Sequence, residues 1–190
     1  MRRVARDLRG MPLRECLALL RSPMHEERLL ALVLMVDDYG RATTSAPERA
    51  SIFAAYLANA RRVNNWDLVD LSAPHIVGAH LLARNRAVLD RLARSGNLWE
   101  RRIAIVATHA FIRAGDVTTT LRIARLVLAD SHDLIHKATG WMLREAEKRD
   151  GRAVRRFLDQ HADNMPRTML RYTIERFSAA EKKRWMARGR

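Results

Sequence analysis

The chain has 190 residues, of which 48% are hydrophobic and only 6% aromatic, and this length fits one domain with a sizeable core. Gly (8) and Pro (5) are scarce, and the absence of period-2 runs of β-branched residues excludes a mainly β fold. Lys and Arg number 35 against 21 acidic residues, a net charge of +14, which indicates a polyanionic partner such as nucleic acid or an anionic membrane. The alternative is an arginine-rich composition with no such partner.

Start and stop signals for helices recur along the whole chain. Three serines precede apolar segments of helical period, as N-cap residues do: Ser22, Ser95 and Ser131. Three glycines follow such segments: Gly40, Gly115 and Gly151. Three prolines stand where first helical turns tolerate them: Pro12, Pro47 and Pro166. These signals predict helices over 12–20, 24–38, 47–61, 65–82, 85–94, 97–113, 117–128, 132–149, 151–160 and 166–177. Pro74 is expected to kink the fourth.

Alignment of the segments at their serines indicates a repeat. Six residues after each serine comes a basic residue: Arg28, Arg101 and Lys137. Nine residues after it comes a small residue: Ala31, Ala104 and Gly140. The serines lie 73 and 36 residues apart, about two periods and one, a spacing typical of HEAT, armadillo and TPR repeats. We therefore predict an all-α solenoid of about five antiparallel helix pairs, whose second helices line a concave, basic face.

Two tryptophans have polar neighbours that could carry chemistry. Trp66 and Asp70 are spaced i, i+4, so they share one helix face and offer an apolar wall beside a carboxylate; the alternative is a core tryptophan with a solvated carboxylate. Trp141 has Lys137 and Arg144 on its own face, which suits contact with DNA. Its alternative is a core tryptophan covered by basic stems.

A similar cluster holds Trp99, Arg101 and Arg102, in which we expect Trp99 to be a core anchor. The repeat puts Trp66, Arg102 and Trp141 early in successive second helices, so they should converge on the concave surface. His132 and His136 have the i, i+4 spacing of a helical metal pair, but no third ligand has convincing spacing. We expect surface histidines there, with neither a metal nor a cofactor.

The single Cys16 excludes an internal disulfide framework and fits a reducing compartment. The longest apolar run, 29–36, is far shorter than the ~20 residues of a membrane span. No apolar stretch follows the N-terminal arginines, so we expect no signal peptide. The expectation is one domain over 1–190 with a basic tail over about 179–190, acting as a monomer in the cytoplasm at the nucleoid, without membrane contact.

Three segments together resemble the AlkD-type DNA alkylation repair glycosylases, a family with HEAT-like repeats. They are NWDLVD at 65–70, NLWERRIA at 97–104 and KATGWMLRE at 137–145, and the resemblance extends over about 12–178. It implies that Trp66, Asp70 and Trp141 occupy the catalytic cleft. It also implies that Arg102 grips DNA near the lesion and that Arg144 contacts the backbone.

The resemblance further implies excision of cationic N3- and N7-alkylated purines from duplex DNA in base excision repair, without the base flipping that most glycosylases use. The tryptophans would contact the deoxyribose, and Asp70 would stabilise its developing positive charge and position water. Arg101, Arg102, Lys137 and Arg144 would bind phosphates without reading sequence. Two alternatives remain: a HEAT-like protein that binds DNA structures without catalysis, and a HEAT-like scaffold for an acidic protein.

Overall fold

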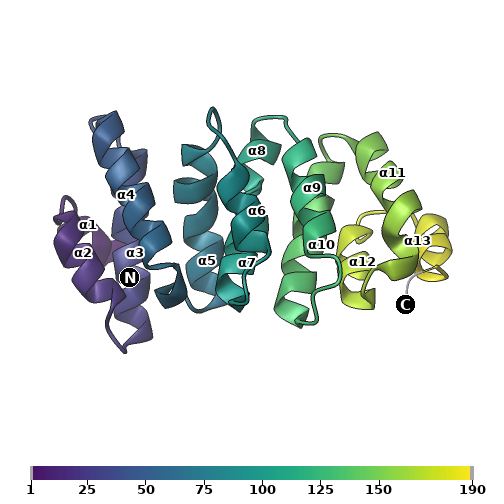
Figure 1. The fold of residues 1–190 in the computed structure, drawn as a ribbon, viewed down its shortest axis with the longest axis horizontal. Helices are drawn as coiled ribbons and strands as arrows, with labels where there is room; N and C mark the ends of the chain where they lie inside the picture. The colour runs from purple at the N-terminus through teal and green to yellow at the C-terminus, as the bar shows by residue number, and fades with distance from the viewer. Residues whose placement is uncertain (1, 189–190) are drawn as a thin grey trace.

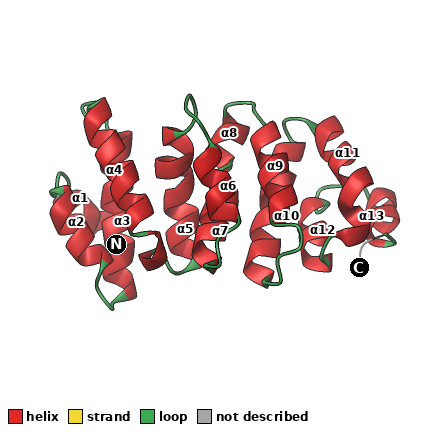
Figure 2. Ribbon diagram, viewed as in Figure 1, coloured by secondary structure: helices red, strands yellow, loops and turns green. Residues whose placement is uncertain are grey.

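The structure is a computed structural model that describes residues 2–188. Within this range all regular structure is helical (Figures 1 and 2). In chain order the elements are α1 (Arg2–Asp7), α2 (Leu13–Leu20), α3 (His25–Gly40), α4 (Ala46–Ala58), η1 (Ala60–Arg62), α5 (Trp66–Ala73), η2 (Pro74–Gly78), α6 (Ala87–Ala93), α7 (Leu98–Val106), α8 (His109–Arg113), α9 (Thr118–Leu126), α10 (Asp133–Glu147), α11 (Gly151–His161), η3 (Ala162–Asn164), α12 (Arg167–Thr173) and α13 (Ala179–Met186). None of these helices is long and apolar enough to cross a membrane.

The helices form antiparallel pairs that follow one another along the long axis of the molecule (Figure 1). The pairs are α2–α3, α4–α5, α6–α7, α9–α10 and α11–α12. Each second helix packs against the second helix of the next pair, in the order α3, α5, α7, α10, α12. We call this row, with the continuations η2 and α8, the second-helix layer. The structure confirms the predicted all-α helical-repeat fold.

The serines that suggested the repeat lie just outside the helices. The N-cap residues of the three segments are Met24, Asn97 and His132. The hydroxyls of Ser22 and Ser95 accept hydrogen bonds from the backbone N–H of the residue two positions later, at 3.0 Å in both turns. The serines therefore shape the turn before the helix, and the prediction that they cap it is wrong.

The basic residues of the repeat hold these turns in place. The guanidinium of Arg28 donates to the carbonyl oxygen of Ser22 at 2.9 Å, and Arg101 donates to that of Ser95 at 3.0 Å. In the third segment His136, and not the aligned Lys137, contacts a carbonyl six residues earlier. Each of these three side chains lies four residues after its N-cap. The repeat is therefore real, with its third copy shifted by one residue.

The small residues of the repeat let helices approach closely. A Cβ atom on Gly140 would lie 2.5 Å from the Cβ of Tyr172 and 2.6 Å from the carbonyl oxygen of Met169, so α10 and α12 pack nearly backbone to backbone. Gly115 has a φ of 90° and ends a helix as predicted. Gly40 is instead the last residue of α3, and Gly151 is the first residue of α11. Neither has a positive φ, so neither is a left-handed residue that follows a helix.

Pro74 interrupts the predicted 65–82 helix, because it has no N–H to donate. The chain passes from α5 into the π-helical turn η2 at this residue. In the next repeat, the predicted 97–113 helix is likewise divided into α7 and α8. Both breaks fall in the middle of the second-helix layer.

Most of the expected basic tail is a helix. Residues 179–186 form α13, which begins with a capping box between Ser178 and Glu181. Trp185 is only 3% exposed and belongs to the hydrophobic core. Residues 189–190 lie outside the described part of the chain. The prediction also missed α1 at the other end.

Candidate functional site

Asp70 and Arg102 form a bidentate ion pair in the middle of the second-helix layer. Arg102 Nε donates to Asp70 Oδ1 at 3.0 Å, and Nη2 donates to Oδ2 at 2.8 Å. The remaining Nη1 donates to the carbonyl oxygen of Leu134 on α10. Arg102 is 5% exposed, whereas the Asp70 side chain is 19% exposed. The pair therefore joins α5, α7 and α10 and leaves only the carboxylate open to solvent.

Opposing effects act on the Asp70 carboxyl group. Burial raises its pKa above the ordinary value, because a low dielectric disfavours the charge. The hydrogen bonds and the positive charge of Arg102 act in the opposite direction. The nearby Asp67 adds a smaller upward contribution. Burial is the largest of these effects, and Arg102 opposes it by favouring the charged carboxylate.

Trp66 is an exposed indole one helical turn before Asp70. It is the first residue of α5, and its backbone N–H donates to the side-chain oxygen of Asn65 at 2.8 Å. Its side chain belongs to the largest exposed apolar groups of the described chain, at 54% exposure. The alternative of a core Trp66 is therefore excluded, and the indole is exposed on the helix that also carries Asp70.

Trp141 lies elsewhere in the same layer. Its ring is partly buried against the core and packs against the ring of His109 on α8, with centroids 5.9 Å apart at 44°. No interaction within residues 2–188 joins Trp141 to Trp66 or Asp70. The structure therefore brings Asp70 and Arg102 together, places Trp66 beside them, and puts Trp141 with a histidine.

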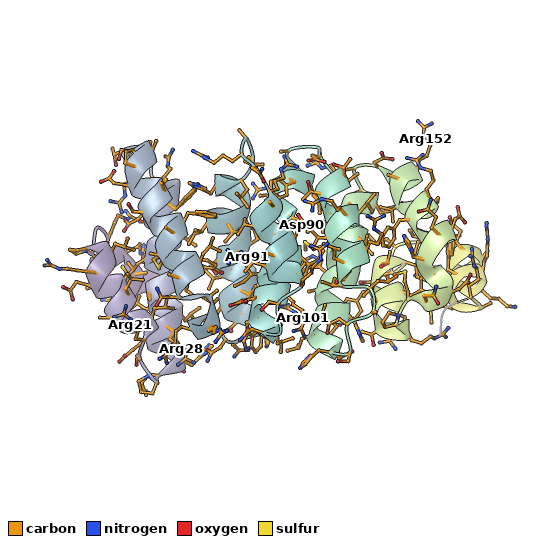
Figure 3. The ribbon with its side chains drawn as sticks, in the orientation of Figure 1. Arg21, Arg28, Asp90, Arg91, Arg101 and Arg152 are labelled. Carbon is orange, nitrogen blue, oxygen red and sulfur yellow. The ribbon has the colours of Figure 1, made fainter. Side chains whose placement is uncertain are left out.

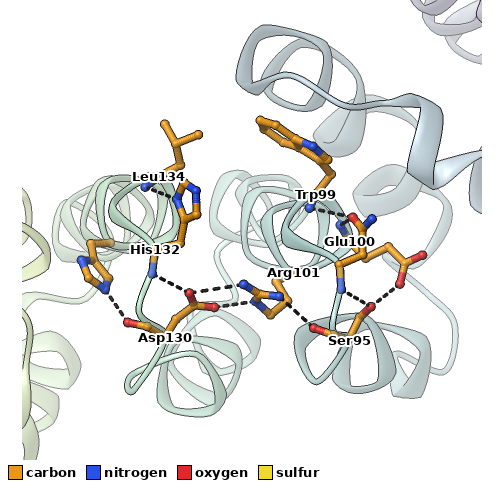
Figure 4. Close-up of polar contacts among 9 residues, drawn as sticks. Ser95, Trp99, Glu100, Arg101, Asp130, His132 and Leu134 are labelled. Carbon is orange, nitrogen blue, oxygen red and sulfur yellow. Dashed lines mark hydrogen bonds and ion pairs between the residues drawn. The ribbon is translucent and has the colours of Figure 1, made fainter.

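Arg101 holds the start of α7 to the neighbouring repeat. Its guanidinium donates to the Asp130 carboxylate at 2.5 Å and to the Ser95 carbonyl at 3.0 Å (Figure 4). The same aspartate accepts from the backbone N–H of His132, so both loops are locked. Trp99 is partly buried against the core, which confirms the core anchor expected from the sequence.

The other two predicted phosphate ligands lie on α10. Lys137 is 43% exposed and pairs with Asp133 at 2.7 Å. Arg144 is less exposed and pairs with Glu175 on the adjacent turn after α12. His132 and His136 stabilise the turn before α10. His132 Nδ1 accepts from the backbone N–H of Leu134, and His136 Nε2 donates to the carbonyl oxygen of Asp130. These histidines therefore have structural partners.

The helices of the second-helix layer are slightly acidic. They contain eight Lys and Arg residues against ten Asp and Glu residues. The positive charge of the molecule thus lies in its loops, its first helices and its terminal helices. The second helices alone therefore do not form a basic face. Any basic surface beside them depends on arginines in the adjacent loops.

Sequence reasoning missed His109 as the neighbour of Trp141. A signal exists in the spacing, because 32 residues separate Asp70 from Arg102 and the same 32 separate His109 from Trp141. The serine alignment gave a period near 36 and hid this interval. A period of 32 along the second helices would have predicted both contacts.

This fold and site define a class: helical-repeat proteins that present an exposed indole and an arginine-held carboxylate on their second helices. Within that class, the family model described as "DNA alkylation repair enzyme" matches residues 1–177. The chain therefore belongs to the DNA alkylation repair enzyme family, and its general role is the repair of alkylated DNA.

A solved structure has the same fold. It is described as "Predicted DNA alkylation repair enzyme from Enterococcus faecalis", and it superposes with a TM-score of 0.69 at 17% sequence identity. The match covers 94% of this chain and 83% of the other. At this identity the likeness supports the fold alone. No curated protein matches the sequence.

Proposed function

We propose that the protein is a DNA glycosylase that excises cationic N3- and N7-alkylated purines from duplex DNA. The observation that carries this proposal is the Asp70 carboxylate, held by Arg102 and open to solvent beside the exposed Trp66, in a member of a DNA alkylation repair family. The product, an abasic site, is the starting material for base excision repair.

The chemistry needs little more than this arrangement. An N3- or N7-alkylpurine is positively charged, so it leaves as a neutral base when its bond to the deoxyribose C1′ breaks. The electron pair of that bond goes to the base, and the sugar develops oxocarbenium character. A fixed carboxylate stabilises this charge electrostatically. Water then adds to C1′ and loses its proton to solvent, so no strong general acid is required.

We assign Arg102 a positioning role. The resemblance implied that this side chain grips DNA, but its Nε, Nη1 and Nη2 all donate to groups inside the protein. In the proposed mechanism Arg102 orients Asp70 and keeps it ionised. Lys137 and Arg144 remain proposed phosphate ligands, since both reach the surface of α10, whereas Arg101 keeps two loops together.

The two tryptophans have different proposed roles. Trp66 presents an open indole to the deoxyribose of a nucleotide that stays stacked in the duplex, so the proposal requires no base flipping. Trp141, supported by His109, would contact the sugar–phosphate surface further along the layer. Since binding relies on phosphates and sugars, we expect it to be tolerant of sequence.

The test is single-turnover release of 7-methylguanine and 3-methyladenine from alkylated duplex DNA by the wild-type protein. Release of either base above the rate without protein, and no release of normal purines from unmodified DNA, is the expected result. Binding without any release would instead favour a non-catalytic DNA binder. Absence of both, with binding to an acidic protein, would favour the scaffold.

A further inference from the structure

An open groove of about 1150 Å³ lies between the C-terminal parts of α3 and α8. Five arginines and one histidine line it: Arg9, Arg41, Arg49, Arg84, Arg113 and His75. One acidic residue, Asp37, lines it as well. We call this cavity the basic groove. None of its residues belongs to the site described above.

The charge of the basic groove is held in place and only partly compensated. Arg49 donates to the carbonyl oxygens of Tyr39 and Arg41 at 3.0 and 2.9 Å, and Arg84 donates to that of His80 at 2.7 Å. Carbonyl oxygens orient a guanidinium without cancelling its charge. Arg113 is exposed and forms no ion pair within residues 2–188. A cleft lined by charges of one sign focuses their field.

Two acidic residues neutralise one edge of the groove. Asp37 pairs with Arg9 at 3.1 Å and with Arg41 at 3.3 Å, and Arg41 also contacts Asp38 at 2.5 Å. Arg84 and Arg113, which follow η2 and end α8, have no such partner among the lining residues. The uncompensated charge therefore faces the side formed by η2 and α8.

The basic groove lies further along the same two chain segments that carry the Asp70–Arg102 pair. Pro74 follows Asp70 by four residues, and Ala110 follows Arg102 by eight. Pro74 and Ala110 line the groove. From Asp70 to the lining residue Ala79, a rise of ~1.5 Å per residue gives about 13 Å, or roughly four nucleotide steps of ~3.4 Å.

We propose that the basic groove binds the sugar–phosphate backbone of the DNA three or four nucleotides to one side of the base that the site acts on. Guanidinium groups match phosphate oxygens in geometry and charge. Part of the lining is apolar, including Leu82, which is 41% exposed, and this part suits the carbon face of deoxyribose. The volume of about 1150 Å³ is far more than one small anion fills, which favours a strand. This inference rests on DNA being bound at the proposed site.

The first test compares two double variants for binding to alkylated duplex DNA at several salt concentrations. Arg84→Ala/Arg113→Ala removes the uncompensated edge of the groove. Arg91→Ala/Arg152→Ala is the matched control, because both arginines are exposed on first helices and form no ion pair within residues 2–188 (Figure 3). The slope of log K against log salt should become about two units shallower in the groove variant. The control should keep the wild-type slope.

The second test shortens the duplex to end two base pairs from the alkylated base, on either side in turn. One of the two truncations should weaken wild-type binding strongly, and the same truncation should cost the groove variant little. A groove variant with the wild-type slope, or equal losses for both proteins on both truncations, would overturn the inference. DNA affinity tests the role of the basic groove, whereas base release tests the proposed glycosylase activity. Either proposal can therefore fail without the other.

Discussion

At the scale of single residues, the proposed site depends on a charge that is buried with its partner. Arg102 has its three donor nitrogens occupied, so its loss would leave the Asp70 carboxylate partly desolvated and alone. Breaking a buried ion pair from one side costs about 3–5 kcal/mol, more than the pair itself contributes. Removal of a residue that positions Asp70 should therefore lower the stability of the protein, whereas removal of a surface ligand for DNA should not.

We therefore predict that Arg102→Met lowers the free energy of unfolding by about 3 kcal/mol. Adding Asp70→Asn should restore part of that loss, because no unpaired charge then remains. Urea titrations of the two single variants and the double variant measure this coupling. If Arg102 instead served only to hold phosphate, its substitution would leave unfolding unchanged and would only reduce the salt dependence of binding.

The sequence predicted some of these residues and not others, for a physical reason. The spacing of Trp66 and Asp70 shows within one helix that the two share a face, and no other information is needed. The contact between Asp70 and Arg102 depends on how α5 and α7 slide past each other. That register is set by packing at positions such as Gly78, where a Cβ would lie 2.2 Å from the Ala107 carbonyl oxygen.

At the scale of helices, apolar periodicity predicted the five pairs, while the ends and breaks were less visible. The capping box at Ser178 is legible in the sequence, but the dense basic residues after it suggested a tail. The N-caps were displaced because Ser22 and Ser95 form hydrogen bonds in the preceding turn. The serines were thus recognised as hydrogen-bonding residues near helix starts, but their bonds fix the turn before the helix and not its cap.

Gly140 provides a test of the close approach between α10 and α12. Gly140→Ala should destabilise the protein by about 1–3 kcal/mol, because the new methyl group overlaps Tyr172 and Met169. Gly40→Ala is the matched control: Gly40 is helical, and nothing lies within 4 Å of the point that its Cβ atom would occupy. That control should be neutral or stabilising by about 0.5–1 kcal/mol. Equal effects in thermal unfolding would contradict the packing.

At the scale of the whole molecule, histidines with lowered pKa values should govern stability near neutral pH. Burial lowers the pKa values of four of them: His75, His80, His109 and His161. His80 is the most enclosed, since it stacks on Phe53 with ring centroids 4.1 Å apart and its Nδ1 lies 3.2 Å from the Tyr39 hydroxyl.

Because the unfolded chain binds protons to these histidines more readily than the folded one, stability should rise with pH in this range. It should be fully present above the ordinary histidine pKa of 6.5 and decrease as pH falls below it. Urea midpoints at pH 7.5 and 5.5 measure the effect. His80→Gln should reduce the difference, whereas His132→Gln, at an exposed N-cap, should not. An increase in stability on acidification would contradict this account.

The charge distribution also belongs to this scale. A net charge of +14 suggested a partner with many negative charges, and membership of a DNA repair family agrees with that. Which surface carries the charge could not be read from the sequence, because acidic and basic residues of one helix face different neighbours. The structure leaves the second helices slightly acidic and concentrates arginines in the basic groove beside them.

The most direct test of the central claim is base release by Asp70→Asn. The substitution keeps the size and much of the hydrogen bonding to Arg102 but removes the charge, so folding and DNA affinity should persist. Single-turnover release of 7-methylguanine and 3-methyladenine should fall by about 10²-fold or more. Asp67→Asn, on the same helix and next to Trp66, is the matched control and should retain most of the rate. Wild-type rates in Asp70→Asn would contradict the role of this carboxylate.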